Sequence, residues 1–229
     1  MKTDLSDLID GGAEDRNVNL TSVADTRYAR MARAGYDLES RTIWLDGEIE
    51  DTTGDWFRYV TWALETESPK TPITVWLNTP GGDVPSMYQI YDAIVGSPSD
   101  ITMIGHGEIV SAGVLIFVAG HKRLVTDNCV FMSHEGADFG GGGGLRHSEA
   151  KDRRRYEDWQ MSRWNELMAR HTPYTAAHWK QITSKKAEFW LLGAEEIIAY
   201  GIAEGVYDPA GRLSKFEPTD APEASGEVD

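Results

Sequence analysis

Short apolar runs alternate with amphipathic stretches along most of the chain. Residues 42–46 and 73–77 are apolar and rich in β-branched and aromatic side chains, which predicts two strands. Between them, apolar residues recur with helical spacing from Asp55 to Thr66, and Asp55 is the expected N-cap. A second amphipathic stretch, 87–95, predicts another helix. Strands that alternate with helices indicate an α/β domain with a largely parallel sheet.

The second half of the chain continues the alternation with one unusually apolar helix. Residues 101–104 predict a strand that we expect Gly105 and Gly107 to break. Residues 112–120 are apolar on every face, which is typical of a helix buried in the core. The other expected elements are strands at 123–126 and 130–133, a glycine run at 140–144, a long charged helix at 148–171 and a short helix at 194–199.

The charge of the chain is strongly acidic and concentrated at the two ends. Its 229 residues carry 22 Lys and Arg against 37 Asp and Glu, a formal net charge of −15. We therefore expect neither nucleic acid nor an anionic membrane surface as a partner. Residues 1–25 predict a flexible acidic arm and 213–229 a disordered acidic tail, on either side of a folded domain at 26–212.

From the cysteine content and the hydropathy of the sequence, we expect the protein to function in a reducing compartment. Cys129 is the one cysteine, so an internal disulfide and a cysteine-based zinc site are excluded, and we predict a small buried hydrophobic residue there. No apolar run approaches the length of about 18 residues that a membrane-spanning helix needs. The start of the chain lacks the pattern of a signal peptide. We expect a cytoplasmic protein with no metal and no cofactor.

Ser111 is the first residue with a chemical role to consider. It follows a predicted strand, lies between Gly107 and Gly113, and directly precedes the apolar helix. A side chain at such a junction lies beside the unpaired N–H groups of a helix N-terminus, which can hold an oxyanion. Serine is also a preferred N-cap residue. The spacing alone therefore leaves two interpretations open, a nucleophile and a helix cap.

Two other segments carry weaker signals of the same kind. Pro80-Gly81-Gly82 follows a strand and is either a plain turn or a backbone that approaches a substrate closely. His134 ends an apolar strand, from which it could act as a general base or lie on the surface. The other five histidines have polar or loop surroundings and are predicted to be surface residues.

Taken in chain order, these segments resemble the ClpP family, the proteolytic subunits of Clp proteases. The resemblance runs from about Leu38 to Tyr207 and leaves the acidic ends uncovered. The motifs that carry it are Leu77-Asn-Thr-Pro-Gly-Gly82, Gly107-Glu-Ile-Val-Ser-Ala-Gly113, Phe131-Met-Ser-His134, Asn165-Glu-Leu-Met-Ala-Arg-His-Thr172 and Gly193-Ala-Glu-Glu-Ile-Ile-Ala-Tyr-Gly201.

The resemblance implies a fold, an assembly and partners. The fold is the ClpP/crotonase-like α/β fold with mostly parallel sheets, flanking helices and a protruding handle, a strand plus a long helix, at about 136–172. The subunits would form heptameric or tetradecameric rings around a chamber that receives unfolded polypeptides. The sequence has no Walker motif, so the unfolding would fall to a separate AAA+ unfoldase such as a Clp ATPase.

The resemblance also implies roles for four residues. Ser111 corresponds to the nucleophile of a serine-type endopeptidase and His134 to its general base. The backbone N–H groups of Gly82 and Ala112 correspond to the oxyanion hole. The implied reaction is peptide hydrolysis through an acyl-enzyme.

One position departs from the family pattern. The family's third catalytic residue is an aspartate, and an ungapped count places Lys185 there, with no aspartate between Asp158 and Asp208. Four interpretations stay open. Glu188 fills the role, Ser111 and His134 work as a dyad, Lys185 serves Ser111 directly, or the subunit is an inactive scaffold or regulator. A crotonase-type acyl-CoA enzyme is a further, disfavoured reading of the same fold.

Overall fold

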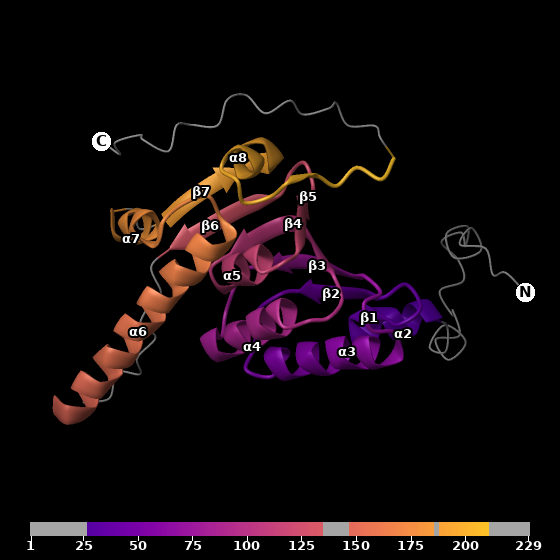
Figure 1. The fold of residues 1–229 in the computed structure, drawn as a ribbon, viewed down its shortest axis with the longest axis horizontal. Helices are drawn as coiled ribbons and strands as arrows, with labels where there is room; N and C mark the ends of the chain where they lie inside the picture. The colour runs from indigo at the N-terminus through magenta and orange to yellow at the C-terminus, as the bar shows by residue number, and fades with distance from the viewer. Residues whose placement is uncertain (1–26, 135–146, 186–187, 211–229) are drawn as a thin grey trace, which may run out of the picture.

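The computed structural model describes residues 27–134, 147–185 and 188–210. The predicted acidic arm, the glycine run and the acidic tail lie outside these residues. Helices pack beside a central sheet, and the first part of the helix α6 (His147–His171) projects from the rest of the described chain (Figure 1). Its last part packs into the core, where Leu167 and Met168 are buried. This is the α/β architecture that the alternating pattern predicts.

An eight-stranded sheet forms the centre of the described chain. Six strands follow one path in the order β1-β2-β3-β4-β5-β8, while β6 pairs with both β4 and β7. The pairs β1–β2 and β6–β7 are antiparallel and the others are parallel. The strands are β1 Tyr36–Asp37, β2 Thr42–Asp46, β3 Ile73–Thr79, β4 Ile101–Val110, β5 Lys122–Val125, β6 Val130–His134, β7 Glu188–Leu192 and β8 Gly205–Val206.

The helices confirm the amphipathic pattern and add two elements that it missed. Those expected from the sequence appear as α3 Thr53–Glu67, α4 Val84–Val95, α5 Ala112–Val118, α6 His147–His171 and α8 Gly193–Ala199. Neither α2 Arg27–Ala34 nor α7 Ala176–Lys185 was predicted. The strand β7 was not predicted either.

Hydrophobic spacing does not predict α7 and β7, because aromatic contacts between the two elements and with Tyr200 stabilise them. Trp179 of α7 is fully buried, with its ring 6.4 Å from Phe189 of β7 and 6.0 Å from Tyr200. The His178 Nε2 atom lies 2.6 Å from the Tyr200 hydroxyl oxygen, and the His178 ring stacks on the Tyr174 ring with their centroids 4.3 Å apart. Burial lowers the pKa of His178. The two elements are stabilised by contacts between distant residues, so their sequences carry little local pattern.

Two local predictions were wrong. Thr52, not Asp55, is the N-cap residue of α3, and Asp55 lies within the first turn, where a carboxylate still favours the helix dipole. The strand β4 also runs straight through Gly105 and Gly107 instead of ending before them.

The two glycines let β4 continue where a side chain would not fit. A Cβ on Gly105 would lie 2.4 Å from the Ile109 side chain. Gly107 has φ of 66° at a register shift in the β3–β4 pairing, and the Asn78 side chain accepts a hydrogen bond from the Glu108 N–H there. The glycines therefore mark a bulge, which bends a strand without ending it. Beyond it, β4 pairs with β6.

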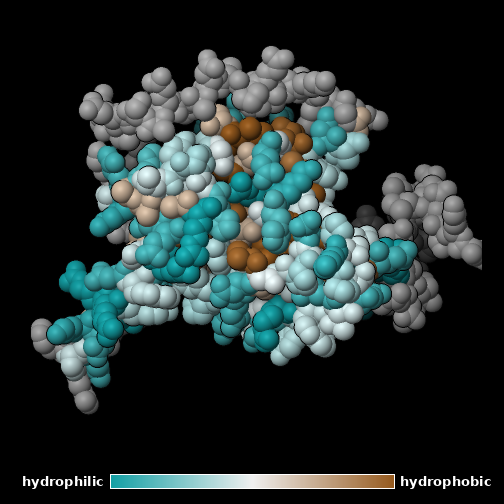
Figure 2. Space-filling model, viewed as in Figure 1, coloured by the Kyte–Doolittle hydropathy of each residue, from teal (hydrophilic) through white to brown (hydrophobic). Residues whose placement is uncertain are grey.

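The core lies between the sheet and the helices. All seven residues of α5 are buried, as the apolar run predicts. Cys129 is fully buried, which confirms the prediction of a small hydrophobic residue, and the burial raises its pKa to about 12. Figure 2 shows a largely hydrophilic surface along the outer part of α6 and hydrophobic atoms near the middle of this face. No helix in the described ranges is long and apolar enough to cross a membrane.

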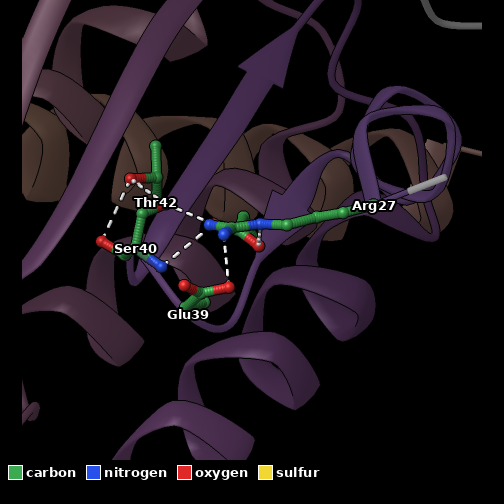
Figure 3. A network of polar contacts seen from close by, with 5 residues as sticks. Arg27, Glu39, Ser40 and Thr42 are labelled. Carbon is green, nitrogen blue, oxygen red and sulfur yellow. Dashed lines mark hydrogen bonds and ion pairs between the residues drawn. The ribbon is translucent and has the colours of Figure 1, made fainter. Parts of the chain in front are cut away.

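A network of hydrogen bonds and ion pairs joins Arg27 of α2 to the turn between β1 and β2 (Figure 3). The Arg27 guanidinium donates to the Asp37 and Glu39 carboxylates. Asp37 is buried and also accepts hydrogen bonds from the Ser40 N–H and hydroxyl, at 2.9 and 2.6 Å. The Arg27 hydrogen bonds, and then those of Ser40, hold the pKa of Asp37 well below its usual value.

We expect Asp37→Asn to destabilise the protein in a pH-dependent way. A carboxyl whose pKa is lower in the folded than in the unfolded chain stabilises the fold above its unfolded pKa, about 3.9. That contribution is lost as the pH falls through the folded value. Urea denaturation at neutral pH should show a lower midpoint for the variant, and the gap should close in strong acid. A gap that stays constant down to about pH 2 would contradict a role for the Asp37 charge.

Candidate active site

The parallel pairing of β4 and β6 brings Ser111 and His134 together. Val110 and Met132 are register partners, and the Ser111 N–H donates to the Met132 carbonyl at 3.0 Å. Parallel strands end at the same edge of a sheet, so the residues after these partners lie close together. The His134 Nε2 atom lies 2.7 Å from the Ser111 Oγ atom. This is hydrogen-bonding distance, and it is the geometry of a nucleophile beside a base.

The backbone of Ser111 is held in an unusual conformation. Ser111 has φ of 56° and ψ of −119°, at the point where β4 turns into α5. It occupies the N-cap position of α5, but its side chain makes no capping hydrogen bond. A non-glycine residue with such a positive φ costs of order 1–3 kcal/mol. The Ser111 side chain therefore points toward His134 and does not cap α5, although capping was one of the two interpretations that the sequence allowed.

The glycine turn after β3 packs directly against Ser111. A Cβ on Gly81 would lie 2.5 Å from the Ser111 Cβ and 3.0 Å from the Ala112 nitrogen. A Cβ on Gly82 would lie 2.2 Å from the Ile49 carbonyl oxygen. Both glycines also have positive φ, at 98° and 142°. Only glycine fits these two positions without a shift of the surrounding backbone.

The turn leaves backbone donors beside Ser111. The Ile49 N–H donates to the Gly81 carbonyl and the Asp83 N–H donates to the Ile49 carbonyl, at 2.8 and 2.7 Å. No hydrogen bond from the Gly82 N–H is found within the described ranges. Ala112 is the first residue of α5, where N–H groups have no partner inside the helix. Gly82 follows Gly81, which packs against Ser111 and the Ala112 nitrogen.

The sheet places Glu188, the first residue of β7, opposite His134. The two residues are register partners in the antiparallel β6–β7 pair, so their side chains lie on one face. Glu188 is exposed, and its Oε2 atom accepts a hydrogen bond from the Trp190 Nε1 at 2.9 Å. Lys185 is the last residue of α7, and its side chain lies outside the described residues. The register therefore favours Glu188 over Lys185 as the neighbour of His134.

Gly81 and Trp190 are the residues of this region that sequence reasoning missed. The glycine pair was singled out, but only Gly82 was given a role, because the closeness of Gly81 to Ser111 depends on the tertiary fold. Trp190 lies in a strand that the hydrophobic pattern did not reveal. Once β7 is a strand, the two-residue spacing of Glu188 and Trp190 places both side chains on one face.

Four of the histidines predicted to be surface residues make tertiary contacts; of these, His121 is exposed as predicted and the other three are partly buried. They pair with groups far away in the chain, which sequence surroundings do not reveal. His106 lies near Asp46, His121 accepts from the Ile101 N–H, His171 bonds Tyr91 and His178 bonds Tyr200. The side chain of the fifth, His147, lies outside the described residues. Within the described ranges, no group of three or more His, Cys, Asp and Glu residues is placed to hold a metal ion.

Comparison with known proteins agrees with this architecture. Residues 27–210 match the family model of Clp protease. Two relatives are named ATP-dependent Clp protease proteolytic subunit 1. The Corynebacterium glutamicum protein is 30% identical over 176 residues, and the Corynebacterium diphtheriae protein is 29% identical over 176 residues. Each alignment covers 74% of this chain and 80% of the relative. The chain belongs to the Clp protease family.

Proposed function

We propose that the chain is a serine-type endopeptidase subunit with Ser111 as its nucleophile and His134 as its general base. The observation that carries the proposal is the distance of 2.7 Å between Ser111 Oγ and His134 Nε2. The strained backbone at Ser111 supports it, because such strain persists mainly where function requires it.

The proposed reaction is acyl transfer in two stages. His134 accepts the Ser111 hydroxyl proton as Oγ attacks the peptide carbonyl, and the resulting oxyanion accepts hydrogen bonds from the Gly82 and Ala112 N–H groups. The imidazolium then protonates the leaving amine as the peptide C–N bond breaks. Water, deprotonated by His134, then attacks the acyl-enzyme. The imidazolium returns that proton to the Ser111 Oγ atom as the ester C–O bond breaks, which releases the carboxylic acid and free Ser111.

We assign the third position to Glu188. Its place opposite His134 in the β6–β7 register supports this assignment. A carboxylate there stabilises the imidazolium and orients the ring. No hydrogen bond between His134 and a carboxylate is present in the described part of the chain. The contact would therefore form when substrate binds or subunits assemble, as catalytic hydrogen bonds often tighten at that stage.

The family membership supports a wider proposal about substrates and assembly. The substrates would be unfolded polypeptides, cleaved in the cytoplasm inside a chamber of heptameric or tetradecameric rings. The relatives are named ATP-dependent, and a separate AAA+ unfoldase would supply that dependence here. The projecting part of α6 suits a contact between rings, because a partner subunit would cover the exposed aromatic side chains of Tyr156 and Trp159.

The second candidate function is a catalytically impaired subunit that shapes a mixed ring. The observation that favours it is Lys185 at the position where an ungapped count expects the aspartate. A missing third residue lowers turnover by about 10⁴-fold in serine proteases. Such a subunit would assemble normally but cleave peptides very slowly.

Labelling with a fluorophosphonate probe tests the proposal. We expect the purified, folded protein to become covalently labelled at Ser111, with peptide mapping as the measurement. Urea-denatured protein is the control, because an unfolded serine lacks an activating base. No label on the folded protein, under conditions where an ordinary serine peptidase labels fully, would favour the impaired subunit.

A further inference from the structure

One face of the strands β4, β6 and β7 carries the residues beside His134. Side chains of alternate residues share a face of a strand, and antiparallel partners share the same face. Met132 and His134 therefore lie on one face with their partners Trp190 and Glu188. Trp190 is 42% exposed, so its indole is accessible on this face. The only other charged side chain of these three strands on it is Glu108, opposite Val130 at the far end of β6.

Glu188 and Trp190 are joined by a hydrogen bond along β7. The indole N–H donates to the Oε2 atom of Glu188 at 2.9 Å. An indole N–H can only donate, and a carboxylate can only accept, so the direction of this bond is fixed. The carboxylate keeps lone pairs on Oε1 for a second donor, and His134 lies directly across the strand pair.

An exposed glutamate rarely keeps one orientation without such a tie. Its side chain has three rotatable bonds, and ordering a side chain of this kind costs considerable conformational entropy. The Trp190 indole is rigid, and its ring lies beside Met132, which is 92% buried. A donor on a rigid, partly buried ring can hold the Glu188 carboxylate on the His134 face of the hairpin.

We propose that Trp190 is a positioning residue that acts through Glu188 on His134. This inference rests on the proposed function, since it needs Ser111 and His134 to carry the reaction. By restricting Glu188, the indole N–H keeps the carboxylate within reach of the imidazole when the reaction requires it. Positioning of this kind matters because small displacements of catalytic groups cost large factors in rate.

The test is the variant Trp190→Phe, which keeps an aromatic ring and removes the N–H donor. Peptide hydrolysis and the rate of fluorophosphonate labelling are measured across a pH series. We expect kcat/KM to fall by about tenfold. We also expect the acid limb of its pH profile to move to lower pH, because the imidazolium loses part of the negative charge that stabilises it. Glu188→Ala should show both changes more strongly.

A double-mutant cycle separates positioning from simple packing. If Trp190 acts through Glu188, adding Trp190→Phe to Glu188→Ala has no further effect on kcat/KM. Trp62→Phe is the matched control, because Trp62 is 63% exposed on α3, away from the sheet, and its replacement should leave the profile unchanged.

Three results would overturn the inference while leaving the proposed function intact. One is a normal rate and profile in Trp190→Phe. Another is a tenfold loss that persists in the Glu188→Ala background with no movement of the acid limb. The third is a gain in rate, which would mean that the indole holds the carboxylate away from His134. Failure of the proposed function looks different, because wild type and Ser111→Ala would then label and hydrolyse equally.

Discussion

Replacing Ser111 with alanine is expected to reduce peptide hydrolysis by about 10⁴- to 10⁶-fold and to abolish fluorophosphonate labelling. The physical reason is the loss of the one oxygen that lies 2.7 Å from the His134 Nε2. Without it no acyl-enzyme forms, and only the slow attack of water beside the backbone donors remains. Alanine also removes no packing from the core, since Ser111 is only partly buried.

Ser133→Ala is the matched control for this measurement. Ser133 precedes His134 in β6, is 1% exposed, and its hydroxyl has no hydrogen-bond partner among the described residues. Its removal should leave both the rate and the stability nearly unchanged. Hydrolysis that persists in Ser111→Ala at the wild-type rate would show that the nucleophile lies elsewhere or that the activity comes from a contaminant.

Gly81→Ala is expected to lower kcat/KM by about 10²- to 10³-fold, the cost of disturbing an oxyanion hole. A methyl group at Gly81 would lie 2.5 Å from the Ser111 Cβ and 2.9 Å from the Val110 carbonyl oxygen. The glycine turn and the Ser111 turn must then move apart, which separates the Gly82 and Ala112 donors. The loss should appear in kcat more than in KM, because these donors act on the transition state.

Gly47→Ala isolates the steric effect from backbone strain. Gly47 has φ of 92°, close to the 98° of Gly81, but a Cβ there would meet no atom within 4 Å. In urea denaturation, both variants should lose about 1–2 kcal/mol of unfolding free energy, because alanine is disfavoured at a positive φ. Only Gly81→Ala should lose activity. Equal activities in the two variants would mean that the packing of Gly81 against Ser111 is not required.

Much of the fold follows from patterns that short windows of sequence contain. The run 112–120 predicts a buried helix because it has no polar face, and α5 is buried along its whole length. Errors occur where a residue's role depends on a distant partner. Gly105 and Gly107 suggest the end of a strand, yet Asn78 and Ile109 surround them in a bulge.

The candidate site divides in the same way. Ser111 directly precedes the predicted apolar helix and His134 ends a predicted strand, and the resemblance of their motifs to the ClpP family selects them. Their distance from each other depends on the pairing of β4 with β6, which a linear pattern does not specify. The position of Glu188 depends on β7. Aromatic contacts with residues outside the strand stabilise β7, and the sequence of the strand does not reveal them.

The sequence by itself determined the α/β class, the largely parallel sheet, the buried helix after Ser111 and the family of the chain. These properties depend on periodicity, residue type and spacing, which are local. Only the tertiary structure decided that Ser111 faces His134 instead of capping its helix, that Gly81 packs on Ser111 and that Glu188 lies opposite His134. Those properties depend on strand register and on van der Waals contact between segments far apart in the chain, and both arise only when the sheet forms.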